Sequence, residues 1–229
     1  MVINKPAGLV VHPGAGHHSG TLLNGLLAHH TEAAHLPRAG IVHRLDKETT
    51  GLMVVAKTLA AHTHLVRQLQ ARSMKRQYQA LVVGEVTGPG QVDEPIGRHP
   101  TQRVKMAVVP DGKPAVTHYT LLARFDDLCT LLSCQLETGR THQIRVHCAH
   151  IGHPLIGDPL YNTRGQIKRC EPEVKKALSH FSRQALHATT LQLIHPMTEK
   201  DLTFNAPLPQ DFKDLLDVLR NAYGGMDNP

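Results

Sequence analysis

The sequence predicts an α+β fold. Short apolar or alternating runs typical of strands outnumber the segments with helical spacing. Strand and helix segments do not alternate regularly along the chain, which argues against a doubly wound parallel sheet. A chain of 229 residues with 41% hydrophobic residues can bury a packed core, and no stretch approaches the length of a membrane span.

The first part of the chain predicts two strands, a helix, a loop, a strand and a second helix. These are expected, in that order, at residues 2–4, 9–12, 22–27, 36–51, 52–56 and 59–72. Thr21 and Thr58 stand directly before the two helical patterns, and threonine is a favoured N-cap residue. Lys-Pro-Ala-Gly separates the first two strands, and a Thr-Thr-Gly turn is expected just before the third.

The remainder of the chain predicts further strands, a hairpin turn, an insert and two helices. The strands are expected at residues 76–86, 128–137, 186–196 and 201–207, the last two joined by a turn at 197–200. The sequence PDGKP at 110–114 predicts a hairpin turn between two alternating segments. Helices are expected from an N-cap at Thr141 to near Gly152 and across 210–222, and the polar residues 162–182 predict an irregular, mobile insert.

Charge and cysteine content indicate the class of partner and the compartment. The formal net charge is +6, and a basic balance favours a polyanionic partner, with RNA or DNA first. Met1 leads straight into VINKP without the pattern of a secretory signal. The four cysteines show neither paired metal spacing nor a disulfide pattern, so they are expected to be thiols in a reducing compartment, which predicts a cytoplasmic protein.

The most informative stretch is residues 39–58, AGIVHRLDKETTGLMVVAKT. It places the carboxylate of Asp46 between the cations Arg44 and Lys47. Neighbouring positive charge favours the ionised carboxylate, which suits a nucleophile or a general base rather than a general acid. An arbitrary aspartate in this setting would be interpreted as part of a solvated salt bridge in a loop.

Six segments of the chain together resemble one enzyme family, the RluA-type pseudouridine synthases. They are, in family order, NKPAGLVVHPG, HRLDKETTGLMVVAKT, KRQYQALVVGEV, GKPAVTHY, LETGRTHQIRVHCAHIGHPLIGDPLY and RQALHATTLQL. VVHPGAG, LPRAGIVHRLDK and DEPIGRHPT are most similar to the RluD branch. The resemblance implies the pseudouridine synthase fold, a mostly antiparallel mixed sheet with flanking helices and a central active-site cleft. It also implies an isomerase that converts uridine to pseudouridine in 23S rRNA, at the stem-loop of the subunit interface.

The resemblance also implies a domain organisation and a partner. Residues 1–223 correspond to the catalytic domain and residues 224–229 to a C-terminal tail. The small N-terminal RNA-binding domain usual in this branch is absent from this chain. The expected partner is 23S rRNA or the precursor of the large ribosomal subunit. No membrane and no obligatory protein partner are expected, and the chain is expected to be a monomer.

In the family, the aspartate of the HRLD motif is catalytic, which implies this role for Asp46. The expected active-site partners are Arg44, Tyr78, Ile144 and Arg145. Arg145 would fix the carboxylate bidentately, Ile144 would supply an apolar wall, and Arg44 would pair with Asp46 or hold a phosphate. Tyr78 would stack on the uracil, with its hydroxyl as a proton carrier. Core packing for the tyrosine and solvent exposure for the arginines are the plain alternatives.

Contacts with RNA are expected from the basic residues Lys47, Arg103, Lys105 and Arg140. Two of these lie in the loop 97–106, GRHPTQRVKM, which would grip the backbone or form an ordinary solvated hairpin. Arg140 precedes a predicted helix, whose N-terminus favours anions. A stacked uridine must be flipped out to reach Asp46.

Isomerisation is neither a redox reaction nor a group transfer, so no cofactor is expected, and no phosphate-binding Gly-rich loop or dinucleotide fingerprint occurs. The histidines at 142, 147, 150 and 153 cluster without the spacing of a metal site, so no metal is expected. Bonds to backbone or phosphate are the preferred interpretation of these histidines.

Several alternatives stay open from the residues alone. Asp46 could attack the ribose carbon, add to the base or abstract a ribose proton. A sister enzyme acting on another 23S rRNA or tRNA uridine shares the same motifs, and a non-catalytic RNA-binding module is a second possibility. An unrelated hydrolase would need a second carboxylate, for which Glu48 is the nearby candidate.

Overall fold

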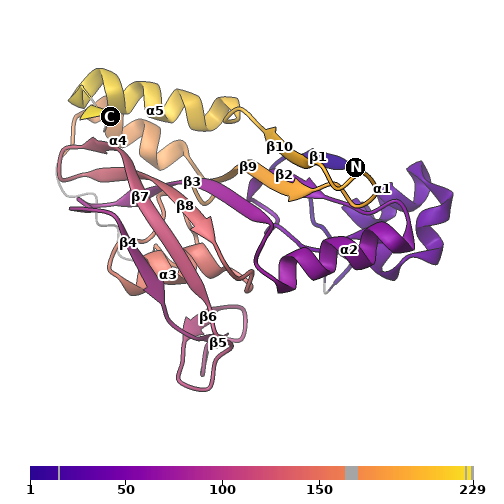
Figure 1. Ribbon diagram of the computed structural model, residues 1–229. Coiled ribbons are helices and arrows are strands. Elements are labelled where there is room, and N and C mark those ends of the chain that lie inside the picture. Colours follow the sequence, from indigo (N-terminus) through magenta and orange to yellow (C-terminus); the bar gives the residue numbers. More distant parts are fainter. Residues whose placement is uncertain (15, 163–169, 225, 228–229) are drawn as a thin grey trace. The chain divides into compact units, whose positions relative to one another are not determined.

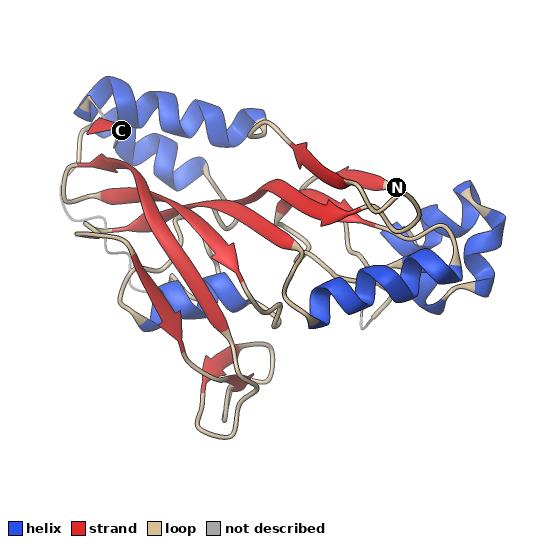
Figure 2. Ribbon diagram, viewed as in Figure 1, coloured by secondary structure: helices blue, strands red, loops and turns tan. Residues whose placement is uncertain are grey.

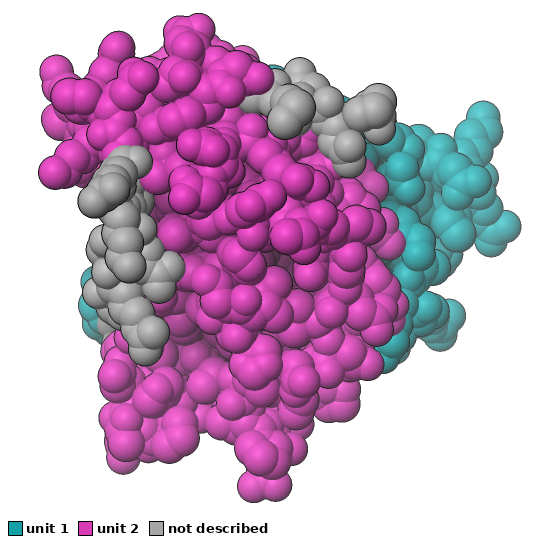
Figure 3. Space-filling model, turned by 90° about the vertical axis from the view of Figure 1, so that its left-hand side faces the viewer, with its two compact units in different colours: residues 1–76, 188–207 teal, residues 77–187, 208–229 magenta. Residues whose placement is uncertain are grey.

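The computed structural model describes residues 1–14, 16–162, 170–224 and 226–227 and confirms the α+β class (Figures 1 and 2). The chain divides into two compact units, coloured separately in Figure 3. The first unit comprises Met1–Arg76 and Ala188–Pro207, and the second comprises Gln77–His187 and Leu208–Pro229. The chain leaves the first unit within β3 (Lys75–Val83) and returns within β9 (Leu186–Ile194).

The first unit is a sheet with α2 (Leu59–Gln70) packed on it. β1 (Val2–Lys5) pairs antiparallel with β2 (Thr50–Val54), β2 neighbours β9, and β9 pairs antiparallel with β10 (Asp201–Asn205). Both N-caps predicted here are confirmed. Thr21 accepts a hydrogen bond from the N–H of Asn24 in α1 (Leu22–His29), and Thr58 accepts one from Ala61. The buried core consists of Leu52, Val54, Ala56, Leu65, Met74, Leu191, Leu193 and Ala206.

Two local predictions for this unit are wrong. Residues 9–12 are not a strand, because the carbonyls of Val10 and Val11 accept hydrogen bonds from the first two N–H groups of α1. The Thr-Thr-Gly sequence is not a turn, because Thr50 and Gly51 already belong to β2. A Cβ atom at Gly51 would lie 2.2 Å from the carbonyl oxygen of Ala188, so close approach of the β9 backbone requires the glycine.

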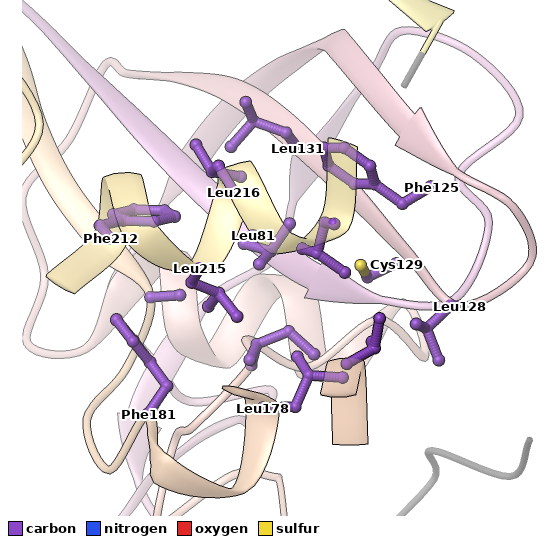
Figure 4. Packing of buried hydrophobic residues seen from close by; sticks show 14 of the residues in the cluster. Leu81, Phe125, Leu128, Cys129, Leu131, Leu178, Phe181, Phe212, Leu215 and Leu216 are labelled. Atoms are coloured by element: carbon purple, nitrogen blue, oxygen red, sulfur yellow. The ribbon is translucent and has the colours of Figure 1, made fainter. Parts of the chain in front are cut away.

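In the second unit, β3 pairs antiparallel with β8 (Cys129–Leu136), and β8 with β7 (Val116–Phe125). β4 (Gly90–Asp93) and β11 (Met226–Asp227) also pair with β7. Helices α4 (Pro172–His180) and α5 (Gln210–Tyr223) cover one face of this sheet. The buried side chains that pack together there include Leu81, Phe125, Leu131, Leu178, Phe181, Phe212, Leu215 and Leu216 (Figure 4). The helix predicted across 210–222 is confirmed as α5, which buries Phe212, Leu215, Leu216 and Leu219.

Helix α3 (Gln143–His150) lies on the opposite face of β8. Successive residues of a strand point to opposite faces, and Leu131 packs with α5 whereas Cys134 hydrogen-bonds to Cys148 of α3. This bond and burial raise the pKa of the Cys134 thiol. All four cysteines are free thiols, as predicted.

Three predictions for the second unit need correction. The segments flanking 110–114 do not pair with each other, because β6 (Met106–Val108) folds back on β5 (Ile96–Arg98). Helix α3 begins one residue later than predicted, with His142 in the left-handed region as its N-cap instead of Thr141. Within the predicted insert, residues 163–169 lie outside the described residues, but 172–180 form α4, which buries Val174 and Leu178 one turn apart.

Candidate functional site

Asp46 lies in a loop that links the short 3₁₀ turn Pro37–Gly40 to β2. Before the aspartate, the N–H of Ala56 donates to the carbonyl of Gly40 at 2.9 Å, and Leu45 is buried. After it, the N–H of Thr49 donates to the carbonyl of Asp46 itself at 3.1 Å, which closes a turn. Asp46 is half-buried. Arg44 and Lys47 are exposed, and Leu45 is buried. The loop therefore presents a carboxylate from a backbone held on both sides.

A fully buried lysine, Lys5, donates a hydrogen bond to the turn that follows Asp46. Lys5, at the end of β1, has 0% relative exposure. Its ammonium group donates to the carbonyls of Pro6 at 2.8 Å, Leu9 at 3.0 Å and Lys47 at 2.8 Å. A buried ammonium is tolerated only where its donors are satisfied. Lys5 thus ties the residue after Asp46 to the first strand of the chain, 42 positions away.

Replacing Lys5 by methionine should destabilise the protein and lower its activity. The change removes the hydrogen bonds to the carbonyls of Pro6, Leu9 and Lys47, and each hydrogen bond contributes about 0.5–1.5 kcal/mol. We expect a loss of about 2–4 kcal/mol in the free energy of unfolding, measured by urea denaturation. Lys200→Met, at an exposed lysine of the same unit, is the control. Equal stability of the two variants would contradict the anchoring role of Lys5.

His43, three residues before Asp46, is held in its neutral form. Its Nε2 accepts a hydrogen bond from the N–H of Val54 at 3.0 Å, so Nε2 carries no proton and Nδ1 does. Nδ1 is enclosed and has no hydrogen-bond partner among the described residues. Burial, together with the positive charge of Arg76, lowers the pKa of His43 from 6.5 to about 3. Protonation would break the bond to β2 that orients the loop.

The stability of the protein should therefore fall as the pH decreases from 6.5 towards 3. In this range the unfolded chain protonates His43 and the folded chain does not, so the unfolded state binds the extra proton. One such group contributes a slope of at most about 1.4 kcal/mol per pH unit. His43→Asn, whose amide oxygen can still accept from Val54, should show a shallower loss than the wild type in thermal melts from pH 6.5 to 4. His35→Asn, at an exposed histidine, should match the wild-type slope.

In the second unit, Arg145 forms a buried bidentate ion pair. Its Nε donates to Oδ2 of Asp158 at 2.7 Å and its Nη2 to Oδ1 at 3.0 Å, and both side chains are at most 4% exposed. Oδ1 also accepts the N–H groups of Leu160 and Tyr161. The guanidinium carbon lies 5.0 Å from the centre of the Tyr161 ring. The carboxylate of Asp158 and the ring of Tyr161 thereby fix the orientation of Arg145.

Asp158 and Tyr161 are functional candidates that the sequence patterns did not indicate. Asp158 lies 13 residues after Arg145, in the segment GDPLY that follows α3. The available signal was an acidic residue within a family-like segment, and no spacing rule connects it to the arginine.

The other predicted partners in this unit are buried. Tyr78 is 5% exposed on β3, where its Cα lies opposite that of Cys134, and Ile144 is 3% exposed on α3. Arg76, Tyr78 and Ala80 are buried while Gln77 and Gln79 are less so, which places these three side chains on one face of β3. Asp46 and Arg44 belong to the first unit, and Tyr78, Ile144 and Arg145 belong to the second.

The basic loop 97–106 forms the end of the β5–β6 hairpin, here named the arm (residues 96–108). Arg98 and Arg103 are exposed, Lys105 is half-exposed, and Arg98 donates to the carbonyl of Arg103 at 3.0 Å. Val104, between Arg103 and Lys105, is 71% exposed. Arg140 is also exposed, and its Nε donates to the carbonyl of Pro114 at 3.0 Å. These positions leave the charged groups accessible to a polyanion.

His147 and His153 of the clustered histidines bond to protein groups. His147 contacts the hydroxyl of Thr117 through Nδ1 at 2.8 Å and the carbonyl of Glu94 through Nε2 at 3.0 Å, and His153 contacts the carbonyl of Val83 at 2.9 Å. This agrees with the preferred interpretation as backbone-bonding histidines. Within the described ranges, no three His, Cys, Asp or Glu side chains are arranged to hold a metal ion. Across those same ranges, no helix is long and apolar enough to cross a membrane.

Comparisons with known proteins identify related chains. The RNA pseudouridylate synthase family model matches residues 1–150. The chain is 59% identical over 221 residues to ribosomal large subunit pseudouridine synthase D of Pseudomonas aeruginosa, covering 96% of this chain and 69% of that protein. It is 56% identical over 224 residues to the protein of the same name from Pasteurella multocida, covering 97% and 69%.

Solved structures agree with these sequence comparisons. Human RNA pseudouridylate synthase domain containing 4 matches with a TM-score of 0.73 at 30% identity, covering 96% of this chain and 89% of that one. Human RNA pseudouridylate synthase domain containing 1 matches with a TM-score of 0.66 at 25% identity, covering 100% and 92%.

Proposed function

Because the chain belongs to the RNA pseudouridylate synthase family, we propose that it isomerises uridine to pseudouridine in the 23S rRNA of the large ribosomal subunit. Relatives with 56–59% identity bear the name ribosomal large subunit pseudouridine synthase D. The observation that carries the proposal is the loop of Asp46, a carboxylate held between two cations within the family match. The proposed target is the stem-loop of the subunit interface, and the proposed compartment is the cytoplasm.

The reaction requires positioned groups more than an added reagent. The bond between uracil N1 and the ribose carbon breaks, the base turns, and a bond from C5 to that carbon forms. The C5 proton is lost to solvent and N1 gains a proton, so atoms and charge balance without a cofactor. We assign the catalytic role to Asp46, which the loop holds ready for either covalent or proton-transfer chemistry.

The remaining site residues keep the roles that the family resemblance implies. Arg145 orients the carboxylate of Asp46, Tyr78 stacks on the uracil, and Ile144 forms an apolar wall. Their burial supports these roles, because groups that meet a flipped base must be shielded from water. Arg44 is exposed, which favours a phosphate contact. Residues 1–223 are proposed to act as one catalytic domain and as a monomer.

The proposed RNA contacts come from Lys47, Arg103, Lys105 and Arg140. They act on phosphate groups, so affinity should fall steeply with salt. If these four contacts are made, the association constant falls with a slope of about −0.7 to −0.9 per contact in a plot of log K against log salt. Filter binding of a 23S rRNA fragment across a series of KCl concentrations measures the slope. Replacing both Arg103 and Lys105 by alanine should reduce the slope by about 1.5. A slope that does not change would contradict their role.

Mapping of pseudouridine in cellular rRNA tests the proposal. A bacterial strain that lacks the gene of the corresponding ribosomal large subunit enzyme is complemented with this chain or with its Asp46→Asn variant. Carbodiimide mapping of large-subunit rRNA should show pseudouridine at the subunit-interface stem-loop with the wild type only. Modification at another 23S rRNA or tRNA uridine would assign the chain to a sister activity, and no modification would overturn the proposal.

A further inference from the structure

The base of the arm is joined to α3 through Tyr161. The Tyr161 hydroxyl accepts a hydrogen bond from the N–H of Met106, the first residue of β6, at 2.9 Å. It also contacts Nδ1 of His142, the N-cap of α3, at 2.8 Å. One oxygen therefore links the arm to the start of the helix that carries Arg145.

Tyr161 contacts Arg145 directly through its ring, and its backbone N–H binds the carboxylate that pairs with Arg145. The guanidinium carbon of Arg145 lies 5.0 Å from the ring centre, within the range of a cation–π contact. The Tyr161 N–H donates to Oδ1 of Asp158 at 3.2 Å, and that carboxylate forms the bidentate pair with Arg145. Arg145, Asp158 and Tyr161 thus contact one another in a closed set.

Further contacts tie the base of the arm to α3. Ile96 of β5 and Val146 of α3 belong to one buried cluster, against which Met106 packs. His147 bonds the carbonyl of Glu94, two residues before β5, and the hydroxyl of Thr117. These contacts hold the base of the arm against α3.

A buried amide completes the attachment of α3 to β7. Gln143 accepts from the hydroxyl of Thr138 at 2.7 Å and from the N–H of Arg140 at 2.9 Å. It donates to the carbonyl of Val116 at 2.9 Å and to the hydroxyl of Thr117 at 3.0 Å. All four hydrogen-bonding sites of the amide are used, which fixes its orientation. The helix is therefore rigidly seated, and Tyr161 is its direct polar link to β6.

We propose that Tyr161 is a positioning residue that couples the contact of the arm with RNA to the orientation of Arg145. The proposal rests on the proposed function and extends it. When the cations of the arm bind the RNA backbone, β6 is held in place, and the bond from Met106 to Tyr161 holds the ring against the guanidinium. Arm contacts therefore promote catalysis as well as affinity.

A double-mutant cycle tests the coupling. The four proteins are the wild type, Tyr161→Phe, the arm variant Arg103→Ala/Lys105→Ala, and the combination. Phenylalanine keeps the ring and removes the hydroxyl. Single-turnover rates of pseudouridine formation are measured at saturating concentrations of a transcribed 23S rRNA fragment, so that affinity does not enter. Tyr161→Phe should slow the wild type about fivefold, the cost of one or two hydrogen bonds. It should slow the arm variant by less than about twofold. In that variant the arm no longer contacts the RNA, so β6 and the ring of Tyr161 are not held in place.

Equal slowing in both backgrounds would overturn the coupling and leave Tyr161 a local packing residue. An unchanged rate in Tyr161→Phe would overturn it as well. Tyr119→Phe, at a tyrosine of β7 in the same unit, is the control and should react at the wild-type rate. Failure of the proposed function is distinguishable, because it would leave the wild type itself inactive in this assay. Thermal melts of all variants establish whether the compared proteins are folded.

Discussion

Replacing Asp46 by asparagine is expected to abolish pseudouridine formation while leaving the fold and most RNA affinity intact. Asparagine has nearly the same shape, and the hydrogen bonds that fix the loop run through the carbonyls of Asp46 and Lys47 and the ring of His43, which all survive the change. The amide can neither attack nor accept a proton as a carboxylate does. We expect the single-turnover rate to fall by at least about 10³-fold, since positioned acid–base groups alone contribute about 10²–10⁴-fold. Quantification of pseudouridine in a treated 23S rRNA transcript measures the loss.

A matched variant separates the chemistry of Asp46 from the charge of its loop. Glu48→Gln removes one negative charge two residues away, in the same turn region, and should retain most activity. Thermal melts and filter binding should show both variants folded and able to bind RNA. Turnover near the wild-type rate in Asp46→Asn would contradict the assignment. Loss in Glu48→Gln alone would favour a different carboxylate as the catalytic group.

Replacing Asp158 by alanine is expected to destabilise the protein more than replacing Lys5 by methionine does. It removes the carboxylate that binds Nε and Nη2 of Arg145 and also the acceptor of two backbone N–H groups. Breaking a buried ion pair by deleting one partner costs about 3–5 kcal/mol. For a chain of this size the melting temperature should fall by about 10 °C. Activity should also fall, because Arg145 would lose its fixed orientation.

An exposed ion pair in the same unit supplies the control. Arg220 and Asp217 lie 3.6 Å apart on α5, with side chains 47% and 66% exposed. Exposed pairs contribute about 0–1 kcal/mol, so Asp217→Ala should shift the melting temperature by no more than about 3 °C. Equal shifts in the two variants, measured by calorimetry, would contradict the importance assigned to burial of the Arg145–Asp158 pair.

Local rules predicted much of the fold. Thr21 and Thr58 cap helices because a threonine hydroxyl can accept the N–H of a residue three positions on, wherever the chain packs. The stripe of Phe212, Leu215, Leu216 and Leu219 likewise predicted α5 with nearly the observed bounds. The expected strand at 9–12 and the hairpin around 110–114 failed because strand pairing depends on distant partners. There, the carbonyls of Val10 and Val11 bind α1, and β6 folds back on β5.

The candidate site was predictable in its charged residues and not in the contacts that support them. Asp46 and Arg145 stand in segments that resemble one family, so their positions could be read from the sequence. Lys5 is a charged residue in a strand, and apolar periodicity gives no reason to expect it at 0% exposure beside the Asp46 turn. Asp158 and Tyr161 meet Arg145 through a turn after α3 whose course depends on tertiary packing. Residues that position a catalytic group by long-range contact leave no spacing pattern.

Tritium release from a 23S rRNA transcript labelled at uracil C5 tests the central claim most directly. Formation of the carbon–carbon bond removes the C5 hydrogen, so each isomerisation releases one tritium to water. With the purified chain and no added cofactor, we predict release in equal amount to the pseudouridine formed, with the RNA strand and its bases retained. Release should be absent with Asp46→Asn. Absence of release with the wild type, or liberation of free uracil in place of pseudouridine, would contradict the account.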